Sequence, residues 1–338
     1  MNLPTYSGFK RGNSKEVIYL DQNFISAIAK VQLGQIKDER FTAIYETLTV
    51  LSEDGKIVIP ESTFHTIESE WASEIIKAKA LEILKSLSRE VSVKDWRDIL
   101  DLQMGRAVEG FFSGVTIQPS RQEVFHKMQR EFLMDTFFDL SVTSRIKDLF
   151  ALHVERRKAL FEKFPGKSRK QLPQETLKFF KIEREDEKQA LVCDYFERPC
   201  RKEHLSNCIV DAYRVNRGHS KIVAGYREFD PDFRRFKEFC NSSELEGVPF
   251  IDIVSSLTAA VTAYEGARSP QTGDFYDILI VGTILPYCDA LATDNFMKSL
   301  LVNRLGFDKK YDVEVFSKKD DEIDRFLRYL DRLTTCQH

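Results

Sequence analysis

Near both ends of the chain, the hydrophobic and polar positions alternate between the spacing of short strands and that of helices. An apolar run ends on Asp21, two helical patterns follow, and a proline at position 60 stops the next apolar run. The elements predicted there are a strand at 16–20, helices at 24–33 and 41–51, a strand at 56–59, and a long helix that begins after Ser62 and runs through Trp71 into the eighties. This order is typical of a parallel sheet.

The same alternation returns after Pro249. The elements predicted there are helices at 251–264 and 275–287, a strand at 290–293 that ends on Asp294, a helix at 295–305, a strand at 312–316 and a charged amphipathic helix at 320–333. Between the two parts, helical patterns alternate with polar connectors, and strand-like alternation is hard to find. Because neither end alone supplies enough strands for a stable sheet, we expect one sheet interrupted by an insertion.

We therefore predict an α/β fold, a three-layer α/β/α sandwich on a mainly parallel sheet, interrupted by a large helical insertion. The predicted boundaries are 16–90 and 250–317 for the discontinuous α/β domain, 91–249 for the helical insert, and 318–338 for a C-terminal helix.

Composition narrows the class of protein. The 338 residues are 42% hydrophobic and 30% charged, as in an ordinary globular protein, and the formal charge of -3 excludes a whole-protein basic field. Any nucleic acid must therefore be held by local basic patches. The N-terminal residues lack the apolar core of a signal peptide, and no apolar run reaches bilayer-spanning length. Together with six scattered cysteines, this predicts a cytoplasmic protein with reduced thiols and no membrane partner.

Five carboxylates are placed where a parallel sheet gathers functional side chains. Asp21 and Asp294 directly follow short apolar strands, and Glu68 lies two turns into the helix after the second strand. Asp274 and Asp277 open the helix that precedes the strand ending on Asp294. Because the carboxyl ends of parallel strands meet at one edge, these groups are expected to converge there. Such a cluster is costly without a counter-charge, so Mg²⁺ or Mn²⁺ is the expected cofactor.

Each carboxylate also has a purely structural interpretation. An aspartate after a strand, such as Asp21, is common turn chemistry. Asp274 would serve as a helix N-cap, and the helix dipole favours any carboxylate in the first turn, where Asp277 lies. Glu68 would then be a solvated helix residue. The joint pattern, rather than any one member, predicts a metal site.

Three segments resemble a branch of the PIN-like nucleases: YLDQN at 19–23, IPESTFHTIES at 59–69 and GDFYDILIVGTILPYCDALATDN at 273–295. The second segment is similar to a P-x-S-x-x-H-x-x-E motif, and the resemblance covers roughly 16–90 and 250–317. It implies that the metal is bound, in chain order, by Asp21, Glu68, Asp277 and Asp294. The glutamate falls farther past the proline than in the common toxin-type PIN domains, so ligation by Glu68 or by a neighbour stays open.

Three further residues lie beside these motifs. His65 shares a helical face with Glu68, and it is interpreted either as a proton carrier or phosphate contact near the metal or as a histidine bonded to a local backbone group. Asn23 would orient a metal-bound water or cap the following helix. Asp289 opens its strand and is therefore expected at the opposite edge of the sheet.

The predicted insert carries the basic patches. The run at 155–170 interleaves lysine and arginine with phenylalanine, and a second patch extends from 198 to 221. These patches are interpreted either as nucleic-acid contacts or as ordinary charged surface exposed to solvent. The residues proposed to hold a phosphate backbone are Arg156, Arg157, Arg169 and Lys170.

Two weaker motifs lie in the same region. The first consists of Cys193, Cys200, His204 and Cys208. Three sulfurs and one nitrogen match the stoichiometry of a zinc site, but the spacing is not standard, and buried thiols are the alternative interpretation. The other, from Arg214 to His219, has the R-x₄-H form of HEPN ribonucleases, but the intervening Gly218 is unfavourable inside a helix.

The combined expectation is a Mg²⁺- or Mn²⁺-dependent endoribonuclease that hydrolyses phosphodiester bonds with a carboxylate cluster. RNA is the preferred substrate over DNA, and a toxin or defence effector controlled by a regulatory protein partner is the expected setting. One alternative is a PIN-like module that binds nucleic acid or a partner and has little or no turnover. Another is a structure-specific DNA nuclease.

Overall fold

The computed structural model describes residues 15–69, 72–115, 118–127, 181–182, 184–185, 188, 238–239, 242–264 and 272–335. The chain forms two compact units. The first unit comprises Met1–Asp95, Ser120–Glu131 and Ile284–His338, and the second comprises Trp96–Pro119 and Phe132–Thr283. The domain boundaries predicted from the sequence stay a prediction.

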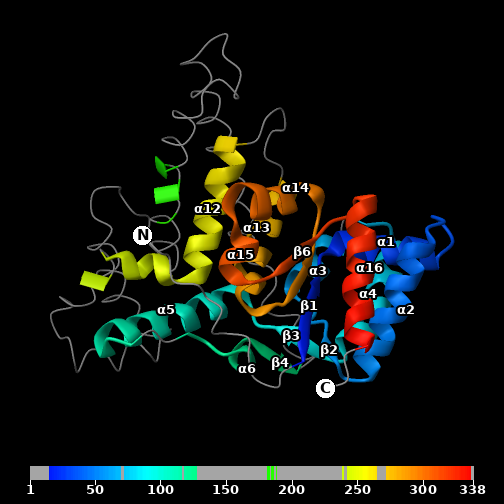
Figure 1. Ribbon diagram of the computed structural model, residues 1–338, viewed down its shortest axis with the longest axis horizontal. Helices are drawn as coiled ribbons and strands as arrows, with labels where there is room; N and C mark the ends of the chain where they lie inside the picture. The colour runs from blue at the N-terminus through cyan, green and yellow to red at the C-terminus, as the bar shows by residue number, and fades with distance from the viewer. Residues whose placement is uncertain are drawn as a thin grey trace, which may run out of the picture. The chain divides into compact units, whose positions relative to one another are not determined.

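A parallel four-stranded sheet lies in the first unit, in the order β2-β1-β5-β6 (Figure 1). Its strands are β1 (Glu16–Leu20), β2 (Ile57–Val58), β5 (Ala290–Ala292) and β6 (Glu314–Phe316). The central strands β1 and β5 are apolar and buried along almost their whole length. The structure thus confirms a mixed α/β fold with a mainly parallel sheet, and the three-layer arrangement stays a prediction.

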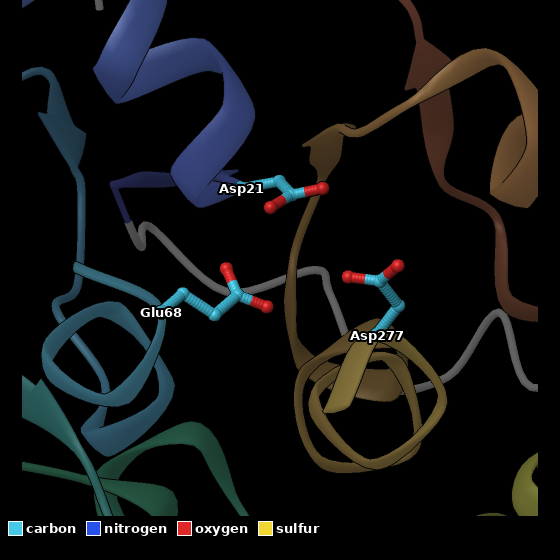
Figure 2. A group of neighbouring side chains, drawn as sticks. All are labelled: Asp21, Glu68 and Asp277. Atoms are coloured by element: carbon cyan, nitrogen blue, oxygen red, sulfur yellow. The ribbon is translucent and has the colours of Figure 1, made fainter. Parts of the chain in front are cut away.

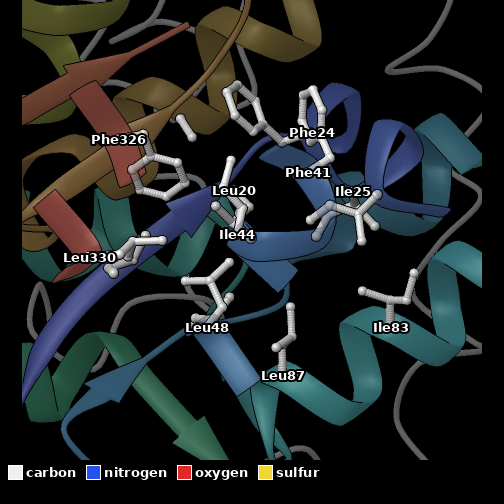
Figure 3. Close-up of a cluster of buried hydrophobic side chains, with 14 of the residues drawn as sticks. Leu20, Phe24, Ile25, Phe41, Ile44, Leu48, Ile83, Leu87, Phe326 and Leu330 are labelled. Atoms are coloured by element: carbon white, nitrogen blue, oxygen red, sulfur yellow. The ribbon is translucent and has the colours of Figure 1, made fainter. Parts of the chain in front are cut away.

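The longer helices of the first unit bury apolar residues in a shared core. The helices of this unit are α1 (Gln22–Gln32), α2 (Glu39–Glu53), α3 (Thr63–Ser69), α4 (Glu74–Ser88), α6 (Arg121–Val124), α14 (Asn295–Lys298), α15 (Phe307–Tyr311) and α16 (Asp320–Thr335), with a 3₁₀ turn η5 at Leu285–Tyr287. Figure 3 shows the core that β1, α1, α2, α4 and α16 share. It includes Leu20, Phe24, Ile25, Phe41, Ile44, Leu48, Ile83, Leu87, Phe326 and Leu330.

The first two helices begin at aspartates that act as N-caps. The Asp21 side chain accepts from the backbone N–H of Asn23, and the Asp38 side chain accepts from that of Arg40. Both caps satisfy a backbone donor that has no partner within the helix. The predicted end of the strand before Asp21 is confirmed, and the helix begins at Gln22, two residues before its predicted start.

The long helix predicted after Ser62 is wrong, because the chain forms two separate helices there. The first, α3, ends at Ser69, and the second, α4, begins after Ser73, whose backbone is extended. Contacts explain the break: His65 bonds the end of β1, whereas α4 packs along α1. A single straight helix would not allow both the bond of His65 to β1 and the packing of α4 along α1.

Two short strands in the region expected to be helical are a second correction. They are β3 (Val91–Val93) and β4 (Phe125–Lys127), which pair antiparallel. Three-residue strands carry too little alternation to be recognised, and this pairing joins residues far apart in sequence. Within the first unit, a salt bridge of 2.7 Å joins Arg121, just before β4, to Asp289, just before β5.

The predicted helix at 295–305 changes its winding along its length. The α14 helix continues as a π-helical segment, η6 (Ser299–Leu305), and Gly306 then takes a left-handed conformation with φ of 64°. Glycine adopts this conformation without a Cβ clash, so it ends the helix, and the short α15 that follows was not predicted.

The second unit is described through its helices α5 (Trp96–Ser113), α12 (Pro249–Tyr264) and α13 (Thr272–Ile284) and a 3₁₀ turn, η4 (Ser243–Gly247). The Trp96 ring stacks on Phe250 with the centroids 5.7 Å apart. Helices α12 and α13 approach closely at Gly282, where a Cβ would lie 2.5 Å from Val254 Cγ2. Across the described parts of the chain, no helix combines the length and the apolar character needed to cross a membrane.

Candidate active site

The parallel register places Asp21 and Thr293 side by side at the carboxyl edge of the sheet. Leu20 pairs with Ala292, and each chain continues one residue beyond this pair. The Asp21 N–H donates to the Ala292 carbonyl oxygen at 2.9 Å, and Thr293 Oγ1 donates to Asp21 Oδ2 at 3.1 Å. Asp21 is only 5% exposed, so the structure holds this carboxylate at a defined place with little water.

Glu68 is the second carboxylate at this edge. One of its oxygens lies within 4.8 Å of an oxygen of Asp21, and Figure 2 shows the two side chains. Within the described ranges, the Glu68 carboxylate has no hydrogen-bond or salt-bridge partner. The structure therefore brings together two of the predicted ligands that lie in the same unit.

The electrostatic environment of these two groups opposes their charge. Burial, together with the negative charges of Asp21 and Asp294, raises the pKa of Glu68 to about 9. Burial also raises the pKa of Asp21, with a smaller contribution from Asp294, whereas hydrogen bonds from Asn23 and Thr293 lower it. Two repelling buried carboxylates of this kind are stabilised by a cation that binds both.

Asp294 follows the strand β5 as predicted, and it begins α14. Its Oδ1 accepts from the backbone N–H of Met297 at 2.6 Å, which is an N-cap interaction. Asp294 is close enough to raise the pKa of both Asp21 and Glu68, but it is outside the group of carboxylates within 4.8 Å of one another in the described part of the chain. The hydrogen bond to Met297 shows the capping role of Asp294, whereas its only link to a ligand role is the effect of its charge on Asp21 and Glu68.

Asp274 and Asp277 are carried by α13, in the second unit. Asp274 is buried in the first turn of this helix, where the dipole favours a carboxylate. Asp277 lies about one turn further along the same helix. Because its helix belongs to the other unit, the participation of Asp277 in the site is taken up as a proposal.

His65 has both ring nitrogens occupied by backbone groups. Nδ1 accepts from the Ser62 N–H at 3.0 Å, so the proton is on Nε2, which donates to the Leu20 carbonyl oxygen at 2.7 Å. The pKa of His65 is lowered to about 4, because the effect of burial is larger than the opposing effect of the bond to Leu20. Of the two interpretations, this geometry favours the histidine bonded to backbone over the proton carrier.

The other residues weighed beside the motifs also have structural partners. The backbone N–H of Asn23 takes part in the cap of α1, and its side chain is exposed. Asp289 Oδ2 accepts from the Val17 N–H at 2.8 Å, near the start of β1. This places Asp289 at the amino edge of the sheet, as expected, because Asp21 follows the end of the same strand.

Several predictions lie outside the described residues. These are the basic residues Arg156, Arg157, Arg169 and Lys170, the patch at 198–221, the zinc-like set Cys193, Cys200, His204 and Cys208, and the R-x₄-H motif at 214–219. They stay predictions.

Sequence reasoning gave no separate role to four polar side chains near the carboxylates: Tyr19, Gln22, Ser69 and Thr293. Tyr19 and Thr293 entered it only as members of an apolar run, a strand and the segments that carry the resemblance. Their polar groups were recognisable as neighbours of the carboxylates in sequence, since Gln22 follows Asp21 and Ser69 follows Glu68. Which partner each would bond depends on the fold.

The donor set fits a divalent cation. Carboxylate oxygens are the ligands that Mg²⁺ and Mn²⁺ prefer. Two oxygens on opposite sides of Mg²⁺ are separated by roughly 4 Å, since each bond is about 2.1 Å long. The separation of at most 4.8 Å between Asp21 and Glu68 is close to this span, so small side-chain movements suffice to bind one ion.

Comparisons of the chain with models of known families, with curated proteins and with solved structures found no match. They neither support nor contradict the resemblance to PIN-like nucleases, which stays a prediction.

Proposed function

We propose that this protein is a divalent-metal-dependent endoribonuclease with a PIN-like active site at the carboxyl edge of its parallel sheet. The observation that carries the proposal is the pair Asp21 and Glu68, two carboxylates within 4.8 Å of each other whose pKa values are both raised. A stability role alone does not explain why two mutually repelling groups are held together in this way. A cation site does.

In this proposal the cation is bound by Asp21, Glu68, Asp277 and Asp294, and Asp274 is a further candidate ligand. A bound Mg²⁺ or Mn²⁺ supplies an activated water and stabilises negative charge on the phosphate. Thr293 orients Asp21 through its hydrogen bond to Oδ2. The ligand set thus draws on residues from widely separated parts of the chain.

RNA is the proposed substrate, and the proposed phosphate contacts are Arg156, Arg157, Arg169 and Lys170. Reversing their charges should weaken RNA binding and flatten its dependence on salt, since each phosphate contact releases counterions. A toxin or defence effector with a regulatory partner remains the proposed setting.

The decisive experiment compares Asp21→Asn with Asp38→Asn. Both residues cap a helix by accepting a backbone N–H two positions later, so asparagine preserves the cap in each. We expect Asp21→Asn to lower cleavage of single-stranded RNA in Mn²⁺ by at least about a hundredfold, the scale of losing one major electrostatic contribution. Asp38→Asn should leave cleavage unchanged, and EDTA should abolish it in the wild type.

Three results would count against the proposal. Cleavage that persists in EDTA, or a folded Asp21→Asn variant with full activity, would remove the metal mechanism. A folded wild type that binds RNA without cutting RNA or DNA would favour the binding-module alternative.

A further inference from the structure

Two side-chain interactions tie the strand that precedes Asp21 to the start of α3. The Tyr19 hydroxyl and Ser62 Oγ are 2.8 Å apart, and His65 Nε2 donates to the Leu20 carbonyl oxygen at 2.7 Å. The Tyr19 ring also stacks on the imidazole, with centroids 5.0 Å apart. These four residues are buried, so water does not compete for the bonds.

A third interaction ties the far end of α3 to the start of α1. Gln22 Nε2 donates to Ser69 Oγ at 2.9 Å, and Ser69 Oγ donates to the His65 carbonyl oxygen at 2.6 Å. Gln22 and Ser69 are buried and directly follow Asp21 and Glu68 in the sequence. The two carboxylates are therefore flanked by bonds that join the same two segments.

We propose that His65 and Ser69 are positioning residues, which hold α3 so that the Glu68 carboxylate stays beside Asp21 and which thereby set the affinity for a divalent cation. This inference rests on the proposed function. Neither side chain needs to touch the ion.

The need for such positioning follows from the physics of α3. The helix has only seven residues, and so short a helix does not persist without tertiary contacts. When both carboxylates are ionised, as they must be to bind a cation, their repulsion acts to separate Glu68 from Asp21. Substitution of residues that orient metal ligands without touching the ion typically lowers metal affinity by about 10–100-fold.

The chain offers a matched pair of variants, Ser69→Ala and Ser52→Ala. Both serines are buried and donate to a backbone carbonyl in the first unit, Ser69 to His65 and Ser52 to Leu87. We expect both variants to lower the melting temperature. Only Ser69→Ala should weaken Mn²⁺ binding to the full chain, by about tenfold or more in isothermal titration calorimetry.

Variants at His65 test rescue by a conservative change. The glutamine amide in His65→Gln carries an N–H that can replace Nε2 as donor to Leu20, whereas His65→Leu removes both ring nitrogens. We expect His65→Leu to weaken Mn²⁺ binding at least as much as Ser69→Ala, and His65→Gln to retain a larger part of the affinity. Circular dichroism checks that each variant is folded.

A metal-free measurement separates positioning from metal binding. In EDTA near neutral pH, Glu68→Gln should raise the melting temperature relative to the wild type. Glutamine is uncharged beside Asp21 without taking up a proton, whereas Glu68 must be protonated on folding or face the negative charge of Asp21. The same change should raise it less in the His65→Leu background, where α3 no longer holds the two groups together.

The outcomes distinguish the two proposals. If His65→Leu and Ser69→Ala bind Mn²⁺ as tightly as Ser52→Ala, and Glu68→Gln has equal effects in both backgrounds, the positioning role is overturned. If the wild type binds no Mn²⁺ but the effect of Glu68→Gln depends on His65, the metal proposal is overturned and positioning of Glu68 stands.

Discussion

At the residue scale, Glu68 lies where burial and two neighbouring carboxylates all oppose its negative charge. Its pKa of about 9 means that, without metal, the folded protein keeps a proton on this group near neutral pH. Asp21 shares the conflict, with a raised pKa, although Thr293 and Asn23 donate hydrogen bonds to it. A cation that binds both oxygens displaces this proton, so metal affinity should rise with pH.

The same shift predicts how stability depends on pH in EDTA. The pKa of Glu68 is raised from 4.5 to about 9 on folding, so its contribution is complete below about pH 4.5 and is lost as the pH rises toward 9. The melting temperature should therefore fall between about pH 7 and pH 9. Glu68→Gln should remove most of that fall, which amounts to a few degrees.

This measurement stays above about pH 7 because His65 acts in the opposite direction in acid. Its pKa is lowered from 6.5 to about 4, so its contribution is present above pH 6.5 and is lost as the pH falls toward 4. If the melting temperatures of the wild type and of Glu68→Gln fall equally between about pH 7 and pH 9, the raised pKa of Glu68 is contradicted.

At the element scale, α16 completes the core of the first unit. Its buried face consists of Ile323, Phe326, Tyr329 and Leu330. Phe326 contacts the rings of Phe24 and Phe316, with centroids 6.0 Å and 4.8 Å away. The C-terminal helix is therefore part of the fold that supports β1, the strand that delivers Asp21.

Phe326→Ala tests this role. Truncating a fully buried phenylalanine should lower the free energy of unfolding by about 3–5 kcal/mol. The control on the same helix is Arg328→Ala, at an exposed position, which should change it by less than about 0.5 kcal/mol. Urea denaturation of both variants gives the comparison, and equal midpoints would show that α16 adds little to stability.

At the scale of the whole molecule, the candidate site depends on segments from both ends of the chain. Asp21 and Glu68 come from the N-terminal part, and Thr293 and Asp294 from the C-terminal part, which meet where β1 pairs with β5. Formation of the ligand set is therefore linked to folding of the first unit, since the unfolded chain brings none of these residues together.

This linkage predicts stabilisation by metal. At a free Mn²⁺ concentration a hundredfold above the dissociation constant, the folded state should gain about 2.7 kcal/mol, visible as a higher melting temperature in differential scanning calorimetry. The effect of Glu68→Gln should reverse in sign, since the variant is more stable than the wild type in EDTA and less stable in Mn²⁺. An unchanged melting temperature at millimolar Mn²⁺ would argue against a metal site.

The sequence by itself determined the two strands that end next to Asp21 and Asp294. Their signals are local: a short apolar run, a polar residue that stops it, and a helix that begins at once. The same local rules identified α1, α2, α12 and α16. The expected carboxylates at the edge of a parallel sheet follow from these elements, because strand direction fixes which end of each strand faces the edge.

Only the tertiary structure decided what depends on partners distant in sequence. His65 was open to a catalytic or a structural interpretation until its bond to Leu20, 45 positions earlier, occupied Nε2. The break between α3 and α4 and the pairing of β3 with β4 arise in the same way, from contacts that local spacing does not encode. The approach of Glu68 to Asp21 is also of this kind, since it opposes electrostatic repulsion and is enforced only by the surrounding packed structure.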